Sequence, residues 1–72
     1  MIRMRYAIVI EKGEHNFGAS VPDLPGVISV GDSEGEVTGN IREAIELHLA
    51  GLREHGDPVP EPRTLVAVVD AL

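Results

Sequence analysis

The hydrophobic pattern of the first 30 residues alternates between apolar and polar or small positions, as half-buried β-strands do. Three stretches predict strands, at residues 6–11, 17–21 and 27–30. In the first strand Tyr6, Ile8 and Ile10 share one face, and the residues between them share the other. The polar, glycine-containing stretch 12–16 predicts a hairpin loop. The short connections indicate an antiparallel meander.

The pattern then changes to a period of about 3.6 residues, which predicts an amphipathic helix from residue 34 to residue 53. Gly56 is the expected C-terminal cap, and Pro58 prevents the helix from continuing. Leu47 lies off the apolar face of this helix. That face comprises Val37, Ile41, Ala44, Ile45, His48, Leu49 and Leu52.

A second extended region is expected after the helix. Residues 57–62 alternate proline with other residues and predict an extended connector. Residues 64–70 are nearly continuously apolar, which predicts a fourth strand covered on both faces. A strand that returns to its sheet after a helix favours a right-handed parallel crossover. We therefore expect an α+β fold of β-β-β-α-β order, with one helix on one face of a four-stranded mixed sheet of strand order 3-2-1-4.

One helix can cover only one face of this sheet, so the other face is expected to stay open. The first and fourth strands place apolar side chains on it, at Ala7, Val9, Val66 and Val68. An open apolar face on a small domain usually marks an interface. A chain of 72 residues also buries only about 60% of its unfolded surface. We therefore expect a partner protein or a homo-oligomer, either a dimer or a tetramer.

The most distinctive stretch lies between the second strand and the helix. Its two prolines stop helices and weaken central strands, and a glycine allows the chain to leave the turn. Ser33 and Glu36 have the spacing of a capping box, in which the serine oxygen accepts from the glutamate amide and the glutamate reaches back. The predicted structural motif comprises Pro22, Asp23, Pro25, Gly26, Gly31, Asp32, Ser33 and Glu36.

Composition and charge narrow the choice of partner. The chain carries 12 acidic and 6 basic residues, and its formal net charge is −6. The basic residues are scattered along the sequence, and only Tyr6 and Phe17 are aromatic, so no direct nucleic-acid binding is expected. A basic protein partner fits this charge, and solubility alone also explains it. The sequence has no cysteine, no signal-peptide pattern and no membrane-spanning run, so we expect a cytoplasmic protein without membrane contact.

Groups that could support catalysis or bind metal are few. His15, His48 and His55 lack the spacing of a metal site, and a structural histidine is the favoured interpretation. Paired carboxylates would favour a metal-dependent nuclease, but the middle of the first strand contains no acid. Turn formation and solvation account for the acidic residues near strand ends, which are Glu11, Asp23, Asp32 and Asp70. No catalytic residue, cofactor or metal is expected.

Several motifs occur here in a fixed order. The stretch 17–26 ends in P-D-L-P-G, Gly31-Asp32-Ser33 follows it, Asn40 and Glu43-Ala44 lie in the helix, and residues 56–62 form the exit. In this combination, over residues 5–70, the chain resembles HicB-type antitoxins, which are short domains with a partial ribonuclease H-like fold. The resemblance implies a β-β-β-α-β fold and a non-catalytic protein.

The resemblance also implies a function. Such a protein binds a small basic HicA-type toxin that cleaves RNA with a catalytic histidine, and it blocks access to that histidine. Many members carry a C-terminal DNA-binding segment, whereas we expect residues 1–72 to form one domain without one. Two alternatives stay open: an orphan homo-oligomer with a structural or small-ligand role, and a minimal nuclease.

Overall fold

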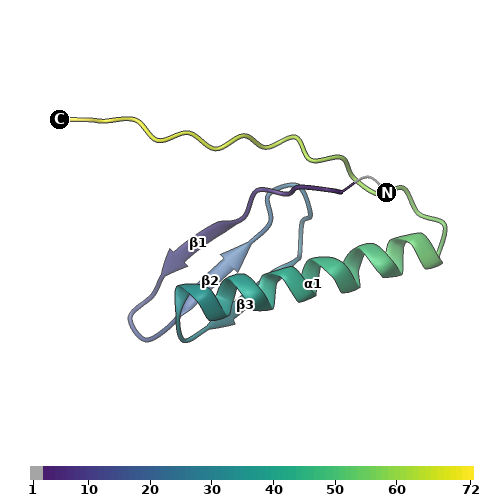
Figure 1. Cartoon of the computed structure of the whole chain (residues 1–72), viewed down its shortest axis with the longest axis horizontal. Helices are drawn as coiled ribbons and strands as arrows, with labels where there is room; N and C mark the ends of the chain where they lie inside the picture. Colours follow the sequence, from purple (N-terminus) through teal and green to yellow (C-terminus); the bar gives the residue numbers. More distant parts are fainter. Residues whose placement is uncertain (1–2) are drawn as a thin grey trace.

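The computed structural model describes residues 3–72 and contains three strands followed by one long helix (Figure 1). The elements are β1 (Val9–Lys12), β2 (Phe17–Ser20), β3 (Ile28–Gly31) and α1 (Glu34–Glu54). The predicted α+β class, the three strands and the helix are therefore confirmed. Each strand is only four residues long, and β1 begins three residues later than the predicted strand.

The three strands form one antiparallel sheet in the order β1-β2-β3. Val9 pairs with Ser20, and Ser20 pairs with Ile28, so these three residues form one row across the sheet. Ile10, Ala19 and Ser29 form the adjacent row. Successive side chains of a strand point to opposite faces, so these two rows lie on opposite faces of the sheet.

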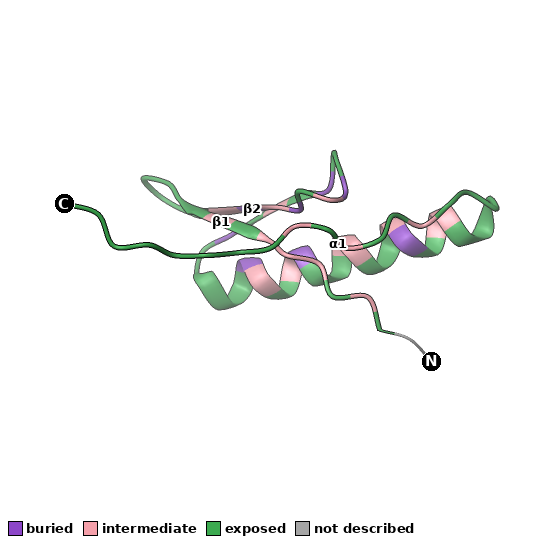
Figure 2. Ribbon diagram, turned by 90° about the horizontal axis from the view of Figure 1, so that it is seen from above, coloured by how far each residue is buried: buried purple, intermediate pink, exposed green. Residues whose placement is uncertain are grey.

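Helix α1 packs on the face that carries the Ile10–Ala19–Ser29 row, and the core lies between the helix and this face (Figure 2). The predicted face of Tyr6, Ile8 and Ile10 is confirmed, since all three pack against the core. The buried core comprises Ala19, Val21, Leu24, Val27, Val37, Ile41 and Leu49. Further half-buried residues packed against it include Phe17, Ala44, Ile45, Leu52 and Val59.

The predicted fourth strand is wrong. Residues 57–72 are extended but contain no strand, and the described part of the chain has a three-stranded, wholly antiparallel sheet instead of a mixed sheet of order 3-2-1-4. The segment after residue 64 runs along the sheet but stands clear of it (Figure 1). The apolar pattern does predict extended backbone here. An extended segment, however, needs hydrogen bonds from a neighbouring strand, and its own sheet does not provide them in this structure.

The C-terminal end of α1 follows the predicted pattern. His55 is the terminal cap, and Gly56 adopts a left-handed φ of 73°. The Asp57 amide donates to the Leu52 carbonyl at 2.8 Å, and the Gly56 amide donates to the Arg53 carbonyl at 3.2 Å. These two bonds are the Schellman arrangement, in which a glycine turns the chain out of the helix. The turn sends residues 57–64 back across the molecule (Figure 1).

Candidate protein-interaction site

Two consecutive turns shape the proline-rich stretch between β2 and β3. The Leu24 amide donates to the Val21 carbonyl at 3.0 Å, and the Val27 amide donates to the Leu24 carbonyl at 3.1 Å. Each turn has proline at its second position, where a fixed φ near −65° is favourable. Gly26 has a φ of 88°, as the third position of a type II turn requires. The motif therefore makes a rigid double turn.

The double turn separates apolar from polar side chains. Val21, Leu24 and Val27 point into the core, and Leu24 is completely buried. Pro22 and Pro25 are exposed, while Asp23 is half-buried at the surface. The turn thus anchors itself in the core and presents one carboxylate outward. Four residues of the predicted motif lie in this double turn, namely Pro22, Asp23, Pro25 and Gly26.

Asp23 holds the chain that returns from α1. One of its carboxylate oxygens accepts from the Arg63 amide at 2.9 Å and from the Thr64 amide at 3.0 Å, and the other accepts from the Thr64 hydroxyl at 2.8 Å. We call this group of hydrogen bonds the Asp23 clasp. The Thr64 amide, and after it the Arg63 amide, lower the pKa of Asp23 because they stabilise the carboxylate form. Sequence reasoning identified Asp23 but not its partners 40 residues away.

A second contact holds the connector further upstream. The Tyr6 hydroxyl donates to the Pro60 carbonyl, and Val59 packs against the core. Partial burial of the Tyr6 phenol raises its pKa, because the charged form is poorly solvated there. Together with the Asp23 clasp, these contacts position the chain as far as Thr64.

The junction between β3 and α1 confirms the predicted capping box. The Ser33 Oγ accepts from the Glu36 amide at 3.0 Å, and Glu36 Oε1 accepts from the Asp32 amide at 3.2 Å. The glutamate therefore reaches back one residue further than a standard capping box requires. Asn40, in the second turn of the helix, donates to the Val30 carbonyl at 2.9 Å and ties α1 to β3.

A glycine is required at position 31 because the backbone of α1 lies very close to it. A Cβ at this position would lie 2.7 Å from the backbone nitrogen of Val37 and 2.9 Å from its Cα. Backbone atoms cannot move aside as a flexible side chain can. The glycine therefore lets β3 pass directly against the first turn of α1, which brings the cap and the sheet together.

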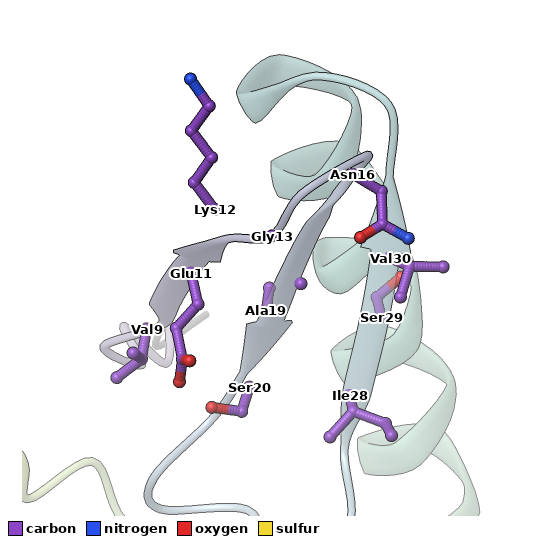
Figure 3. A pocket seen from close by; sticks show the side chains of 11 residues that line it. Val9, Glu11, Lys12, Gly13, Asn16, Ala19, Ser20, Ile28, Ser29 and Val30 are labelled. Atoms are coloured by element: carbon purple, nitrogen blue, oxygen red, sulfur yellow. The ribbon is translucent and has the colours of Figure 1, made fainter.

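The face of the sheet opposite α1 is open and apolar. Val9 is 43% exposed, Ile28 71% and Val30 63%. They surround a shallow depression of about 390 Å³ that also includes Gly18 and Ser20 (Figure 3). Glu11 and Lys12 lie at its β1 end, where Lys12 points away from the depression (Figure 3). A cluster of large exposed apolar side chains on so small a domain is typical of an interaction surface.

The four residues predicted for this face do not gather there. Val9 does lie on it, whereas Ala7 is half-buried in the segment that leads into β1. Val66 and Val68 lie on the extended C-terminal segment and are exposed, because no fourth strand brings them onto the sheet. Ile28 and Val30, which sequence reasoning did not assign to the face, complete it. The alternation within residues 27–30 could have identified them as a pair on one face.

The fold also gathers basic residues that are far apart in the sequence. Arg3, Arg5, Arg42 and Arg53 line one groove, of about 520 Å³, between the segment before β1 and α1. Its floor is apolar and includes Ile8, Ile41, Ile45 and Leu49. Glu46 is the acidic residue that lines this groove. Arginines that are scattered along the sequence therefore form a local positively charged cluster around this groove, although the protein as a whole is acidic.

Residues 3–72 contain no group of three or more histidine, cysteine, aspartate or glutamate side chains close enough to bind a metal ion. The His55 ring nitrogen Nδ1 is 2.8 Å from the Gly51 carbonyl, which places this histidine in the helix terminus. No helix in this part of the chain is both long and apolar enough to cross a membrane.

Comparison with known proteins gives relatives from several sources. A 14.9 kDa protein from the rep-hol intergenic region of Haemophilus phage HP1 is 41% identical over 58 residues, which are 81% of this chain and 44% of that protein. A UPF0150 protein of Thermoplasma acidophilum is 34% identical over 58 residues, covering 79% of this chain and 84% of the relative. A UPF0150 protein of Helicobacter pylori is 52% identical over 44 residues, or 61% of each chain.

The chain thus spans less than half of the phage relative and most of the archaeal one. No solved structure matches it significantly. Residues 6–72 match the family described as HicB_like antitoxin of bacterial toxin-antitoxin system. This match includes the strands, the double turn, the capped helix and the extended C-terminal segment. The chain therefore belongs to the HicB-like antitoxin family.

Proposed function

We propose that this protein is the antitoxin of a type II toxin–antitoxin pair and that it blocks a small basic HicA-type toxin that cleaves RNA. The observation that carries the proposal is the family match over residues 6–72. In this proposal the protein acts as one non-catalytic domain that binds the toxin and not nucleic acid. Because the toxin acts on RNA, the pair works in the cytoplasm.

The open sheet face supports this role. Val9, Ile28 and Val30 present an apolar surface that a partner can desolvate, and no element of the described chain covers it. Burying such a surface contributes roughly 25 cal/mol for each Å² of apolar area. The net charge of −6 would steer a basic toxin toward the protein and raise its association rate at low salt.

The protein also self-associates in this proposal. Large apolar side chains remain exposed on the sheet and on the C-terminal segment, and a chain of 72 residues has a small core. A dimer would cover part of this surface and leave another part for the toxin. Sedimentation velocity of the purified protein tests this: a mass of one chain at micromolar concentration would contradict it.

The decisive test is an RNA cleavage assay with the cognate toxin. The wild-type protein should suppress cleavage in a stoichiometric manner and should cleave no RNA itself. Ile28→Lys places a charge on the open face and should weaken suppression at least about tenfold. Leu47→Lys is the matched control, because Leu47 is equally exposed but lies on α1. Equal effects of the two substitutions would exclude the open face as the toxin site, and RNA cleavage by the protein alone would overturn the proposal.

A further inference from the structure

The C-terminal segment, residues 65–72, is extended but pairs with no strand of the sheet. Leu65 is 93% exposed and Val68 91%, and Val66 and Val69 are also exposed. None of the four packs against the core. The preceding residues, in contrast, are held by Tyr6 and by the Asp23 clasp. The segment is thus anchored at Thr64, and the apolar side chains that follow are exposed.

The chain exposes more surface than a compact protein of the same mass. A compact protein of 7.7 kDa exposes about 4,300 Å², whereas this chain exposes 5992 Å². Its radius of gyration is 13.7 Å, against about 11 Å for a compact chain of this length. The surplus surface of about 1,700 Å² per copy is as large as the total area buried in a standard protein–protein interface.

The place that lacks a strand is the edge of the sheet at β1. In the core-facing row Ala19 in β2 is buried and the two edge residues, Ile10 in β1 and Ser29 in β3, are half-buried, but of these two only Ile10 is apolar. Ile8, just before β1, is also half-buried, and it lines the groove against α1. The outer side of β1 also leaves backbone donors and acceptors without a neighbouring strand. An added strand would satisfy these groups and cover the β1 side of the core.

We propose that residues 65–70 of one copy pair with β1 of a second copy, and that the exchange is reciprocal. Each copy carries both the strand that is donated and the edge that accepts it, so two copies related by a two-fold axis satisfy both needs and form a closed dimer. Both alternating sets are apolar as far as Val69. One set therefore joins the core-facing layer and the other extends the open face beside Val9.

The clasp makes a second copy the better acceptor. The Asp23 clasp fixes residues 63 and 64 at the double turn, and the segment leaves this point without packing on its own core. The hinge of the exchange therefore lies at residues 64 and 65. The inference rests on the self-association proposed above and not on toxin binding, so suppression of RNA cleavage can fail or succeed independently of it.

Cysteine cross-linking between separately purified copies tests the exchange, because the natural chain contains no cysteine. Val9→Cys is mixed with either Val68→Cys or Val69→Cys, two neighbours whose side chains point to opposite faces of a strand. A bismaleimide with a spacer of about 8 Å reaches direct and diagonal cross-strand neighbours. Exchange predicts a cross-linked heterodimer with one of the two donor variants. Leu47→Cys replaces Val9→Cys in the control mixture and should give no heterodimer with that donor.

Cysteines at positions 9, 68 and 69 also show whether the segment pairs with β1 of its own chain or with neither β1. In a double variant with cysteines at 9 and 68, or at 9 and 69, exclusive cross-linking within one chain would show that the segment docks on its own β1, and this would overturn the exchange. Absence of both products would place the segment elsewhere and would also overturn it. As a second measurement, Val66→Lys combined with Val68→Lys should raise the dimer dissociation constant by roughly tenfold or more for each charge, whereas Leu47→Lys should leave it unchanged.

Discussion

The double turn and the C-terminal segment are both rich in branched apolar residues, yet they differ completely in burial. Val21, Leu24 and Val27 of the turn are buried, whereas Leu65, Val66 and Val68 of the segment are exposed. The turn makes its own backbone hydrogen bonds, between residues three positions apart. An extended segment cannot do this and must find another strand. The comparison shows that hydrophobicity alone does not determine burial, because the source of hydrogen-bond partners also matters.

A core truncation and a segment truncation give the largest contrast. Ile41→Ala removes a side chain that is 1% exposed and should cost about 2–5 kcal/mol of unfolding free energy. Val66→Ala should change the stability of the monomer by less than about 0.5 kcal/mol, because Val66 has little native packing to lose. Urea unfolding at a concentration too low for self-association measures both. A similar cost for the two variants would mean that the segment packs within one chain.

Alanine substitutions at two glycines distinguish a glycine required by close packing, Gly31, from one that only makes the helix backbone more flexible, Gly35. Gly31→Ala introduces a Cβ 2.7 Å from the Val37 backbone nitrogen and should destabilise the fold by about 1–3 kcal/mol. Gly35→Ala, in the first turn of α1, meets nothing within 4 Å and should stabilise it by roughly 0.5–1 kcal/mol. Thermal unfolding of both variants tests the prediction. If Gly31→Ala were neutral, the approach of β3 to α1 would have to be looser than described.

The N-terminal cap of α1 should have an intermediate effect. Ser33→Ala removes the acceptor for the Glu36 amide and should cost about 1 kcal/mol. For a chain of this size the melting temperature should fall by roughly 4–8 °C. Ser20→Ala in β2 is the control, since no hydrogen bond of its hydroxyl is found in the described chain, and it should have a much smaller effect. Equal shifts would show that the cap does not stabilise α1.

The Asp23 clasp should have the smallest effect on global stability and a clear effect on pH dependence. The pKa of Asp23 is lower in the folded state, so its contribution is complete above the ordinary aspartate pKa and is lost as the pH falls through the lowered pKa. The amide resonances of Arg63 and Thr64 should shift in this acidic range, and Asp23→Asn should abolish the shift. Glu61→Gln serves as the control and should leave both titrations unchanged.

Much of the candidate site was predictable from local patterns. The spacing of Ser33 and Glu36 predicts a capping box at the start of a helix. The pair Pro25-Gly26 likewise predicts a type II turn. Val9 was predicted on the open face from strand alternation alone. Ile28 and Val30 also lie on the open face, which the patterns of the first and fourth strands alone do not predict.

Long-range partners could not be predicted in this way. The bonds between Asp23 and Thr64, and between Tyr6 and Pro60, join residues 41 and 54 positions apart. Nothing in the sequence near Asp23 distinguishes a carboxylate that caps its own turn from one that binds a distant amide. The grouping of four arginines around one groove has the same origin, since it depends on how the segment before β1 crosses α1.

The sequence by itself determined the order of the elements, the double turn, both ends of α1 and the side of β1 that faces the core. These features depend on residues within a few positions of one another, where backbone geometry leaves few alternatives. Only the tertiary structure decided that no fourth strand joins the meander, which distant residues form the clasp, and that residues 65–72 are exposed. The apolar pattern of this segment encodes a need for a neighbouring strand but not its location. Strand pairing is a long-range interaction, and its partner can belong to the same chain or to another.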